Sequence, residues 1–446
     1  MKNKNDLIIF NAWICQITNK GINPIFGDIK ISDGKILEIR EKKYSDYLSN
    51  PEISKKGFDA EGRVITVPQI NFHDHFYSRL AKGLPISGSM DNFENVLKNL
   101  WWKLDLALDL EMVRASAQMA VLESIRNGVT YIIDHHASPA KTFGSLDVIK
   151  ETIDKFSLRA VLCFETSDRN GEESKKQALI ENLKFIKNSD NNIKGMLGLH
   201  ASFTISDETL KRCSEIIKET GAGIHIHLCE DKVDRVKSVT EYGLPPVQRL
   251  QKYGLLNSKS ILVHGIDLIE PDYSMVSKSG SALVYNPDSN LNNNVGLPDF
   301  NSVPNLIPIL VGTDGMSANV ARSMKQLFLQ HRIQGNSFDE SFNWTRKIYF
   351  DQLKFVKNYF PDFPSLQVGD RADFILWDYV LPTPLTKENF WGHYIYGILE
   401  YPVHSVVQNG NCLMRNFSLA IENENEIKTA ISKQGRRLFE KFRKLQ

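Results

Sequence analysis

The chain has 446 residues, of which 42% are hydrophobic and 24% are charged, a composition typical of globular proteins rather than disordered or fibrous ones. Its length exceeds that of one ordinary core and fits a barrel of about 250–300 residues together with a smaller unit. The 54 basic and 53 acidic residues leave a net charge of +1, which predicts neither a nucleic acid nor an anionic membrane as a partner.

The cysteines and the N-terminus bear on where the chain resides. Five widely spaced cysteines form no Cys-x-x-Cys pair, which favours a reducing compartment over a disulfide framework. The short apolar run Leu7–Phe10 is too brief for the core of a signal peptide. No segment approaches the ~18 uninterrupted apolar residues of a membrane span. We therefore expect a cytoplasmic protein.

Both ends of the chain predict short strands joined by turns. The N-terminal runs rich in Ile, Val and Phe are Asp6–Trp13, Phe26–Ser32, Lys35–Ile39 and Arg63–Val67. The C-terminal runs are Asp373–Trp377, His404–Gln408 and Cys412–Arg415. Asp33-Gly34 and Asn409-Gly410 have the form of tight hairpin turns. Because chain ends often meet in one domain, we predict that residues 1–65 and 366–446 form a small composite β-sandwich. A terminal helix, Asn425–Gln446, would dock on the rest.

The middle of the chain, residues 66–365, alternates buried strands with helical patterns. Eight apolar runs are Val64–His73, Val129–Asp134, Leu158–Glu165, Ile193–His200, Gly223–Leu228, Ser260–His264, Ser281–Asn286 and Pro308–Gly312. The clearest helix has Asp109 as its N-cap and Gly128 just past its end. Eight strands linked by helices predict an α/β fold, a (β/α)8 TIM barrel. After the seventh strand, Asp288–Asn305 predicts a long loop.

Histidines and carboxylates gather at the predicted C-terminal ends of these strands, where barrel enzymes place their catalytic groups. His73 and His75 close the first strand, and residues two apart on a strand share a face, so both rings aim at one point. His227 ends the fifth strand and Asp314 follows the eighth. Three imidazoles and one carboxylate suit a catalytic divalent metal, and the lack of cysteine among them disfavours a structural zinc site.

A proton carrier is needed beside such a metal, because the metal acidifies water. Glu230 follows the fifth strand and is placed to pass that proton to the leaving atom. An offset of three puts Glu230 on the opposite strand face from His227, so the strand must end or bulge between them. His264, at the sixth tip, would orient the water or the polarised substrate, with a buried structural histidine as the alternative.

Other residues near the tips are candidates for substrate contacts. They are Trp102, His135, His136, Glu165, His200 and Asn286. One tryptophan ring would suit stacking on a heterocycle, although tryptophan pairs usually belong to the core. The tip histidines either contact substrate or hydrogen-bond one another, and both interpretations stay open. His225 lies one pleat deeper than His227 and is predicted to pack in the core.

Four motifs stand in order along the chain: His73-x-His75, His227-x-x-Glu230, Val263-His264-Gly265 and Gly312-Thr313-Asp314-Gly315. Together with the composite β-domain, they resemble the amidohydrolase superfamily, in the subgroup of purine and triazine deaminases and chlorohydrolases. Three further segments are similar to SsnA-type aminohydrolases, which are linked by name to selenium metabolism. These segments are Asn99–Asp105, Ile133–Pro139 and Cys163–Asn170. Asp134-His135-His136 is also similar to 8-oxoguanine deaminases.

The resemblance implies a metal-dependent aminohydrolase with one divalent ion, zinc or alternatively iron. The ligands would be His73, His75, His227 and Asp314. Glu230 would move protons, His264 would assist, and Asp314 would hold or deprotonate the attacking water. Hydrolysis of an amidine-type C–N bond in a small nitrogenous heterocycle would release ammonia. Members with two metals carry a carboxylated lysine at the end of strand four, where this chain has Gly198-Leu199-His200. The resemblance also implies a homo-oligomer, a dimer or larger.

Two departures from the family pattern bear on the substrate contacts. Pro68-Gln69 stands where relatives carry Pro-Gly, so any need for positive φ there is unmet. Tyr285-Asn286-Pro287 stands where relatives often carry His-Asn-Pro. Two alternative functions also stay open. One keeps the site but releases chloride or an alkylamine, and the other is a non-catalytic metal-binding subunit of a selenium-related redox assembly. The complete set of ligands argues against the second.

Overall fold

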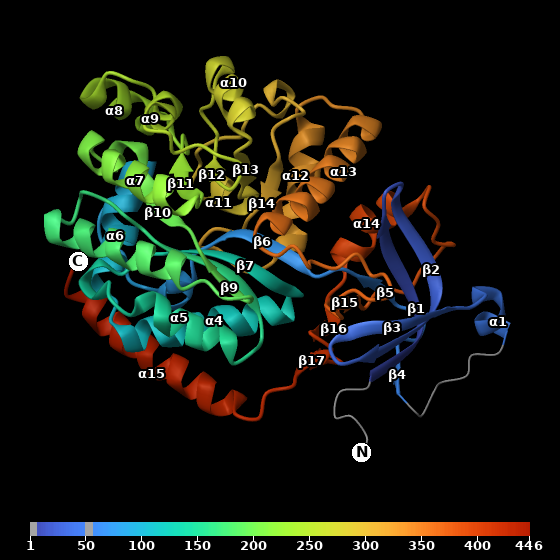
Figure 1. Ribbon diagram of the computed structural model, residues 1–446. Coiled ribbons are helices and arrows are strands. Elements are labelled where there is room, and N and C mark those ends of the chain that lie inside the picture. The colour runs from blue at the N-terminus through green and yellow to red at the C-terminus, as the bar shows by residue number, and fades with distance from the viewer. Residues whose placement is uncertain (1–6, 50–56) are drawn as a thin grey trace.

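The computed structural model describes residues 7–49 and 57–446 of the chain, so the first residue of the expected strand Asp6–Trp13 lies outside it (Figure 1). Its helices are α1 (Tyr44–Ser49), α2 (Phe93–Val96), α3 (Trp102–Ala107), α4 (Leu110–Arg126), α5 (Ser145–Asp154), α6 (Glu172–Lys187), α7 (Asp207–Thr220), α8 (Lys232–Tyr242), α9 (Pro246–Lys252), α10 (Glu270–Ser279), α11 (Pro287–Asn292), α12 (Val320–Ile333), α13 (Phe338–Phe355), α14 (Phe390–Tyr396) and α15 (Glu424–Arg443).

Strands from both ends of the chain form one nine-stranded sheet. Its order is β18 (Ser418–Leu419), β17 (Asn411–Arg415), β16 (Val403–Gln408), β15 (Phe374–Trp377), β5 (Val64–Thr66), β1 (Leu7–Thr18), β2 (Gly21–Ser32) and β3 (Lys35–Glu41), with β4 (Phe58–Asp59) also paired to β1. Figure 1 shows the blue N-terminal strands beside the red C-terminal ones. β5 and β15 pair antiparallel and join the two ends, as the sequence led us to expect. A division into two packed layers stays a prediction.

The two hairpin turns expected in this sheet are confirmed by their backbone angles. Asp33 and Gly34 have φ of 50° and 75°, and Asn409 and Gly410 have φ of 51° and 73°. Two successive left-handed residues are what a two-residue turn between twisted antiparallel strands requires.

The middle of the chain builds two parallel sheets. One has the order β6 (Gln69–Asp74), β7 (Val129–His136), β8 (Arg159–Phe164) and β9 (Ile193–Gly195). The other has the order β10 (Leu197–Ala201), β11 (Ile224–Leu228), β12 (Ile261–His264), β13 (Ala282–Tyr285) and β14 (Ile309–Val311). Isolated parallel bridges connect the sheets at Asp74 with Asp314 and at Thr166 with Leu199. Figure 1 shows helices around these strands. Because neighbouring strands pair in parallel, their carboxyl ends lie at the same edge of each sheet.

Two of the expected strands are divided in the structure. The run Val64–His73 gives its first part to β5 in the nine-stranded sheet and its last part to β6, and Pro68 between them has no N–H to give to a ladder. The run Ile193–His200 is broken at Met196, so that β9 pairs with β8 and β10 with β11. Gly198 lets the chains come close there, because a Cβ on it would lie 2.4 Å from the Phe164 carbonyl oxygen.

The prediction of a long loop after the seventh strand is wrong for the first part of that segment. Pro287 begins the short helix α11 instead, and a single 3-10 turn, Phe300–Ser302, follows. A proline is favourable in the first turn of a helix, because its missing N–H would have no partner there. This helix brings Ser289 and Asn290 to the strand ends.

The helix expected between Asp109 and Gly128 is confirmed as α4. The Asp109 carboxylate accepts from the Met112 amide at 3.0 Å, and Gly128 adopts a φ of 69°. The terminal helix α15 packs on α4, where Figure 1 shows it along the lower edge of the molecule, and Arg437 donates to Asp109 at 2.7 Å. Leu438 of α15 is fully buried in this contact.

Truncating Leu438 to alanine is expected to lower the free energy of unfolding by about 2–5 kcal/mol, because it leaves a cavity under α15. Denaturant unfolding of the whole protein measures the change. Lys441→Ala, at an exposed position of the same helix, is the matched control and is expected to stay within about 0.5 kcal/mol of wild type. A Leu438→Ala protein as stable as the control would show that α15 does not depend on this packing.

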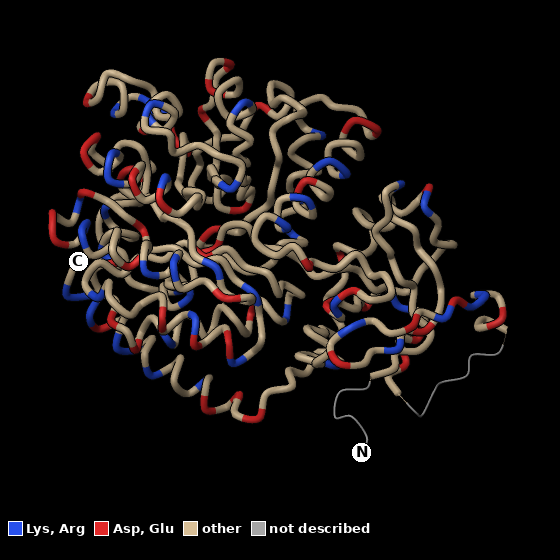
Figure 2. The backbone as a smooth tube through the Cα atoms, in the orientation of Figure 1, with Lys and Arg blue, Asp and Glu red and all other residues tan. Residues whose placement is uncertain are grey.

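Charge is spread evenly over the described part of the chain. Figure 2 shows basic and acidic segments intermingled over the helices and the nine-stranded sheet. Within the described ranges, no helix combines the length and the apolar character that a membrane crossing requires.

Candidate metal centre and active-site pocket

Four side chains meet at the carboxyl ends of the parallel strands. His73 lies in β6 and His75 directly follows it, His227 lies in β11, and Asp314 follows β14. The backbone brings the first and last strands together, because the amides of Thr313 and Asp314 both donate to the carbonyl oxygen of His73, at 2.9 and 3.0 Å. Two segments 240 residues apart in the chain thus become one side of a site.

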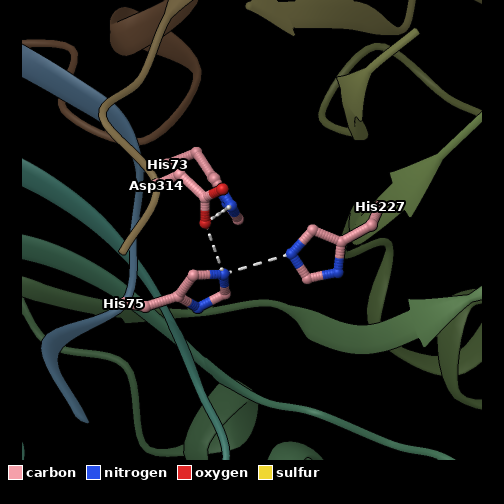
Figure 3. A group of neighbouring side chains, drawn as sticks. All are labelled: His73, His75, His227 and Asp314. Carbon is pink, nitrogen blue, oxygen red and sulfur yellow. Dashed lines mark hydrogen bonds and ion pairs between the residues drawn. The ribbon is translucent and has the colours of Figure 1, made fainter. Parts of the chain in front are cut away.

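Ligand atoms of these four residues lie within 4.8 Å of one another. The Asp314 Oδ1 is 3.4 Å from His73 Nε2 and 3.0 Å from His75 Nε2, and His75 Nε2 is 3.2 Å from His227 Nε2. Figure 3 shows the imidazole rings and the carboxylate turned toward one another. Three imidazoles and one carboxylate around a common point are the donor set of a catalytic divalent metal site.

In each of the three histidines, the Nδ1 atom that does not face the cluster has a hydrogen-bond partner. His75 Nδ1 donates to the His135 carbonyl oxygen at 2.6 Å, and His227 Nδ1 donates to the His200 carbonyl oxygen at 2.9 Å. A carbonyl can only accept, so these bonds place the hydrogen on Nδ1 and leave the Nε2 lone pair free for a metal. His73 Nδ1 lies 2.8 Å from the Nε2 of the deeper His225. The tautomers of His75 and His227 therefore suit coordination through Nε2.

The electrostatics of the cluster also favour a cation. Burial opposes ionisation of Asp314, but hydrogen bonds from His73 and His75 hold its pKa well below the usual range. Burial lowers the pKa of His73 to about 3. For His75 the same burial is outweighed by Asp314, which raises its pKa to about 9. A buried carboxylate that stays ionised stabilises positive charge at this point, and a divalent ion fits these residues.

Glu230 reaches the same side of the site because the strand ends before it. β11 stops at Leu228, and Cys229 adopts a φ of 49°, which turns the chain between His227 and Glu230. The expected interruption of the strand is thereby confirmed. Burial raises the pKa of Glu230 to about 7, with His264 acting in the opposite direction. A carboxyl group that titrates near neutrality is suited to carrying a proton.

His264 is fully buried beside Glu230. Its Nε2 is 3.4 Å from Glu230 Oε2 and 4.0 Å from Asp314 Oδ2, and its Nδ1 lies 2.8 Å from the Asn290 amide oxygen. The amide oxygen accepts from Nδ1, so the Nε2 presented to the site carries a lone pair when the ring is neutral. The structure thus brings Glu230, His264 and Asp314 together.

Backbone strain marks three positions at the rim. Cys229, His264 and Asp314 all have positive φ, of 49°, 75° and 53°. Such angles are unfavourable for residues with side chains and persist where the surrounding structure holds them, often at functional sites.

A pocket opens beside the cluster, with an empty volume of about 620 Å³ that includes the open solvent at its mouth. Of the candidate substrate contacts, Trp102, Glu165 and His200 line it, together with the ligands His75 and His227. Trp101, the other member of the tryptophan pair, also lines it, and the structure adds the aromatic side chains Tyr77, Phe93 and Phe203.

Three other candidates are placed behind the pocket lining. His135 Nε2 donates to the Leu199 carbonyl oxygen at 3.0 Å, and His136 Nε2 lies 2.8 Å from the Ser138 hydroxyl oxygen. Asn286 is 1% exposed and does not line the pocket. All three side chains are buried, and His135 and His136, as consecutive residues of β7, point to opposite faces of the strand.

Four polar residues at the site were not among the candidates predicted from the sequence. Ser289 donates to Asp314 Oδ2 at 2.5 Å, and Asn293 donates to Glu230 Oε1 at 3.2 Å. Both come from the segment that was expected to be a loop. Asp105 and Arg169 also line the pocket. Asp105 lies one helical turn after Trp102 in α3, a spacing visible in the sequence. Arg169 lies in the loop between β8 and α6, where no helical spacing marks it.

The two departures from the family pattern have little effect on the pocket. Gln69 is not among the described residues with positive φ, so the position does not require glycine. Its backbone N–H donates to the Gly128 carbonyl oxygen at 2.9 Å. Tyr285 is fully buried against Phe300, with ring centroids 5.4 Å apart, and does not line the pocket.

Comparisons with known proteins agree with this geometry. The chain is similar to the 5′-deoxyadenosine deaminase of Methanosarcina barkeri, with 26% identity over 95% of this chain and 96% of that protein. It is 23% identical to a 5-methylthioadenosine/S-adenosylhomocysteine deaminase of Desulforudis audaxviator, over 97% and 99% of the two chains.

Solved structures show the same fold. An adenosine deaminase from Xanthomonas campestris with bound zinc superimposes with a TM-score of 0.80, at 18% identity, over 97% of this chain and 98% of that one. An atrazine chlorohydrolase from Arthrobacter aurescens complexed with zinc has a TM-score of 0.76 at 17% identity, over 96% and 100% of the two chains. The family model described as the amidohydrolase family matches residues 69–413, and the chain belongs to that family.

Proposed function

We propose that this protein is a metal-dependent aminohydrolase that removes ammonia from the amino-bearing carbon of a purine-type heterocycle. The observation that carries the proposal is the convergence of four ligand atoms within 4.8 Å of one another, on the wall of an aromatic-lined pocket that also contains Glu230. Relatives named as deaminases of 5′-deoxyadenosine and methylthioadenosine support an adenosine-type substrate.

One divalent ion, zinc or alternatively iron, is proposed at His73, His75, His227 and Asp314. When bound, it supplies a Lewis acid that makes water a better nucleophile near neutral pH. Hydrogen bonds behind the ligands hold the rings in place, since the carbonyl oxygens of His135 and His200 fix two of them. Zinc in the solved neighbours supports this ion.

The residues of this chain supply the proton route. Glu230 takes a proton from the attacking water and delivers it to the ring nitrogen next to the amino-bearing carbon. His264, held by Asn290, faces both Glu230 and Asp314 and steadies the water between them. As the C–N bond breaks, the proton of the added hydroxyl group passes to the departing amino group, so ammonia leaves and a carbonyl group replaces the amino group.

A screen for ammonia release tests this proposal. Zinc-loaded and iron-loaded protein would be assayed with 5′-deoxyadenosine, adenosine, guanine, 8-oxoguanine, pterins and guanidino compounds. We expect ammonia from a purine-type substrate. Chloride from a chlorotriazine without ammonia from any of these compounds would favour the alternative leaving group. Neither product, from protein that binds metal, would favour the non-catalytic alternative.

The finer features of the fold and assembly are also proposals. The isolated bridges between the two parallel sheets support one closed barrel of eight strands, with residues 1–65 and 366–446 as the composite domain. A homo-oligomer, a cytoplasmic location and the likeness to SsnA-type aminohydrolases stay predictions from the sequence.

A further inference from the structure

The lining of the active-site pocket is rich in carboxyl groups. Its acidic side chains are Asp105, Glu165, Glu230, Asp234 and Asp314. Among the described lining residues, only Arg169 carries a permanent positive charge. Even a divalent ion at the ligand cluster would leave the five carboxyl groups facing three positive charges. When these carboxyl groups are ionised, the pocket repels anions.

Two of these carboxyl groups share a single guanidinium. Arg169 Nη2 contacts Asp105 Oδ2 from α3 and lies 2.7 Å from Glu165 Oε1, which follows β8. The side chains of Asp105 and Glu165 are only 2% and 4% exposed. One guanidinium does not neutralise two buried carboxylates, and an uncompensated buried charge is costly. The cluster therefore gains from a second positive charge.

Acceptor atoms at this cluster also lack donors. Asp105 Oδ1 is buried without a hydrogen-bond partner among the described residues. Glu165 Oε2 lies 3.9 Å from His135 Nδ1, too far for a hydrogen bond. Because His135 Nε2 donates to the Leu199 carbonyl oxygen, the neutral ring presents a lone pair on Nδ1. A ligand with several N–H donors would satisfy these acceptors.

The surrounding walls suit the same kind of ligand. Trp102 lies against Arg169, with the guanidinium carbon 5.3 Å from the ring centroid, so this wall already stabilises a cation. Phe93, Trp101 and Phe203 extend the aromatic lining. Aromatic faces combined with carboxylates are a common way to bind ammonium and guanidinium groups.

The pKa values of Asp105 and Glu165 are consistent with a site that gains from a second positive charge. Burial raises the pKa of Asp105 to about 7, although Arg169 acts to lower it. Burial also raises the pKa of Glu165, again against the effect of Arg169. Both groups are thus harder to ionise than usual until more positive charge arrives.

We propose that Asp105 and Glu165 form a specificity subsite for a positively charged substituent of the substrate, an ammonium or a guanidinium, beside the metal-ligand cluster. The inference rests on the proposed function and narrows it, because it selects cationic substrates over neutral ones and disfavours carboxylates. Arg169 bridges the two carboxyl groups through its Nη2 atom.

Three matched nucleosides that differ in charge at one position test the subsite. They are 5′-amino-5′-deoxyadenosine as the cation, 5′-deoxyadenosine as the neutral compound and adenosine 5′-carboxylic acid as the anion. With zinc-loaded wild-type protein, we expect kcat/KM for the cation to exceed that for the neutral compound by about tenfold or more, since a charge-assisted hydrogen bond is involved. The anion is expected to fall below the neutral compound by a similar factor.

Thermal stabilisation by the same three compounds gives a second readout that does not require turnover. No ammonia from any of them, with the cation still stabilising the protein most, would overturn the adenosine-type substrate of the proposed function and keep the subsite. Ammonia release with an equal or reversed order of the three would overturn the subsite alone. No release and no stabilisation by any compound would overturn both.

Single substitutions test whether Asp105 and Glu165 cause the preference for the cationic substrate. Glu165→Gln and Asp105→Asn are each expected to reduce the ratio of cation to neutral kcat/KM to within about threefold of unity, because each removes one of two charges and leaves Arg169 with a partner. Glu111→Gln, an exposed position on α4 outside the pocket, makes the same charge change and is expected to keep the wild-type ratio. An unchanged ratio in both pocket variants would contradict the assignment.

Discussion

Replacing Glu230 with glutamine is expected to reduce kcat by roughly 10²–10⁴-fold, the usual contribution of a positioned acid or base. The amide keeps the shape of the side chain and its contact with Asn293 but cannot take up and release a proton near neutral pH. Burial raises the pKa of the Glu230 carboxyl group to about 7, and the glutamine side chain has no titratable group to replace it. Steady-state ammonia release on the substrate found in the screen measures the change.

The metal content of the Glu230→Gln protein distinguishes a proton-transfer defect from a damaged site. Glu230 is not among the four proposed ligands, so the variant is expected to bind as much metal as wild type. Glu241→Gln, an exposed position on α8, controls for the loss of one acidic charge and should keep full turnover. Full turnover by the Glu230→Gln protein with its metal intact would rule out the proton shuttle.

Removing the metal is expected to reduce turnover below detection, and adding zinc or iron is expected to restore it. The reason is that no other group in the pocket can activate water to the same extent. Dialysis against a chelator, followed by activity measurements before and after metal is returned, makes the test. Circular dichroism of the metal-free protein checks that the fold persists. A folded, metal-free protein with undiminished turnover would contradict the assignment.

Local chemistry explains why much of the metal cluster was predictable from the sequence. His73 and His75 are two residues apart on a strand, and that spacing alone aims both rings at one side. His227 and Asp314 were placed by the rule that barrel strands end on one face. The structure brings all four together within 4.8 Å.

The features that the sequence did not reveal depend on contacts between distant segments. The run Val64–His73 has an even apolar pattern, and only its partners β15 and β7 show that it serves two sheets. Asp288–Asn305 is polar, like a loop, and its helix α11 forms where Pro287 can begin it.

Which candidate residues line the pocket depends on their burial in the folded protein, and the local sequence does not indicate this. His135, His136 and His200 all stand at predicted strand tips, but only His200 lines the pocket. Asp105 and Arg169 are 64 residues apart, and their contact depends on how α3 folds over the end of β8. Substrate specificity is therefore the part of the site that needs the three-dimensional structure most.

The most direct test of the central claim is the number of metal ions bound per chain, measured by elemental analysis of the purified protein and correlated with its ammonia-releasing activity. We expect one divalent ion per chain in fully active protein, and loss of both the ion and activity in His227→Ala. A folded protein that binds no divalent ion after exposure to zinc and iron would contradict the account. So would a requirement for two ions, or full activity of the His227→Ala protein without bound metal.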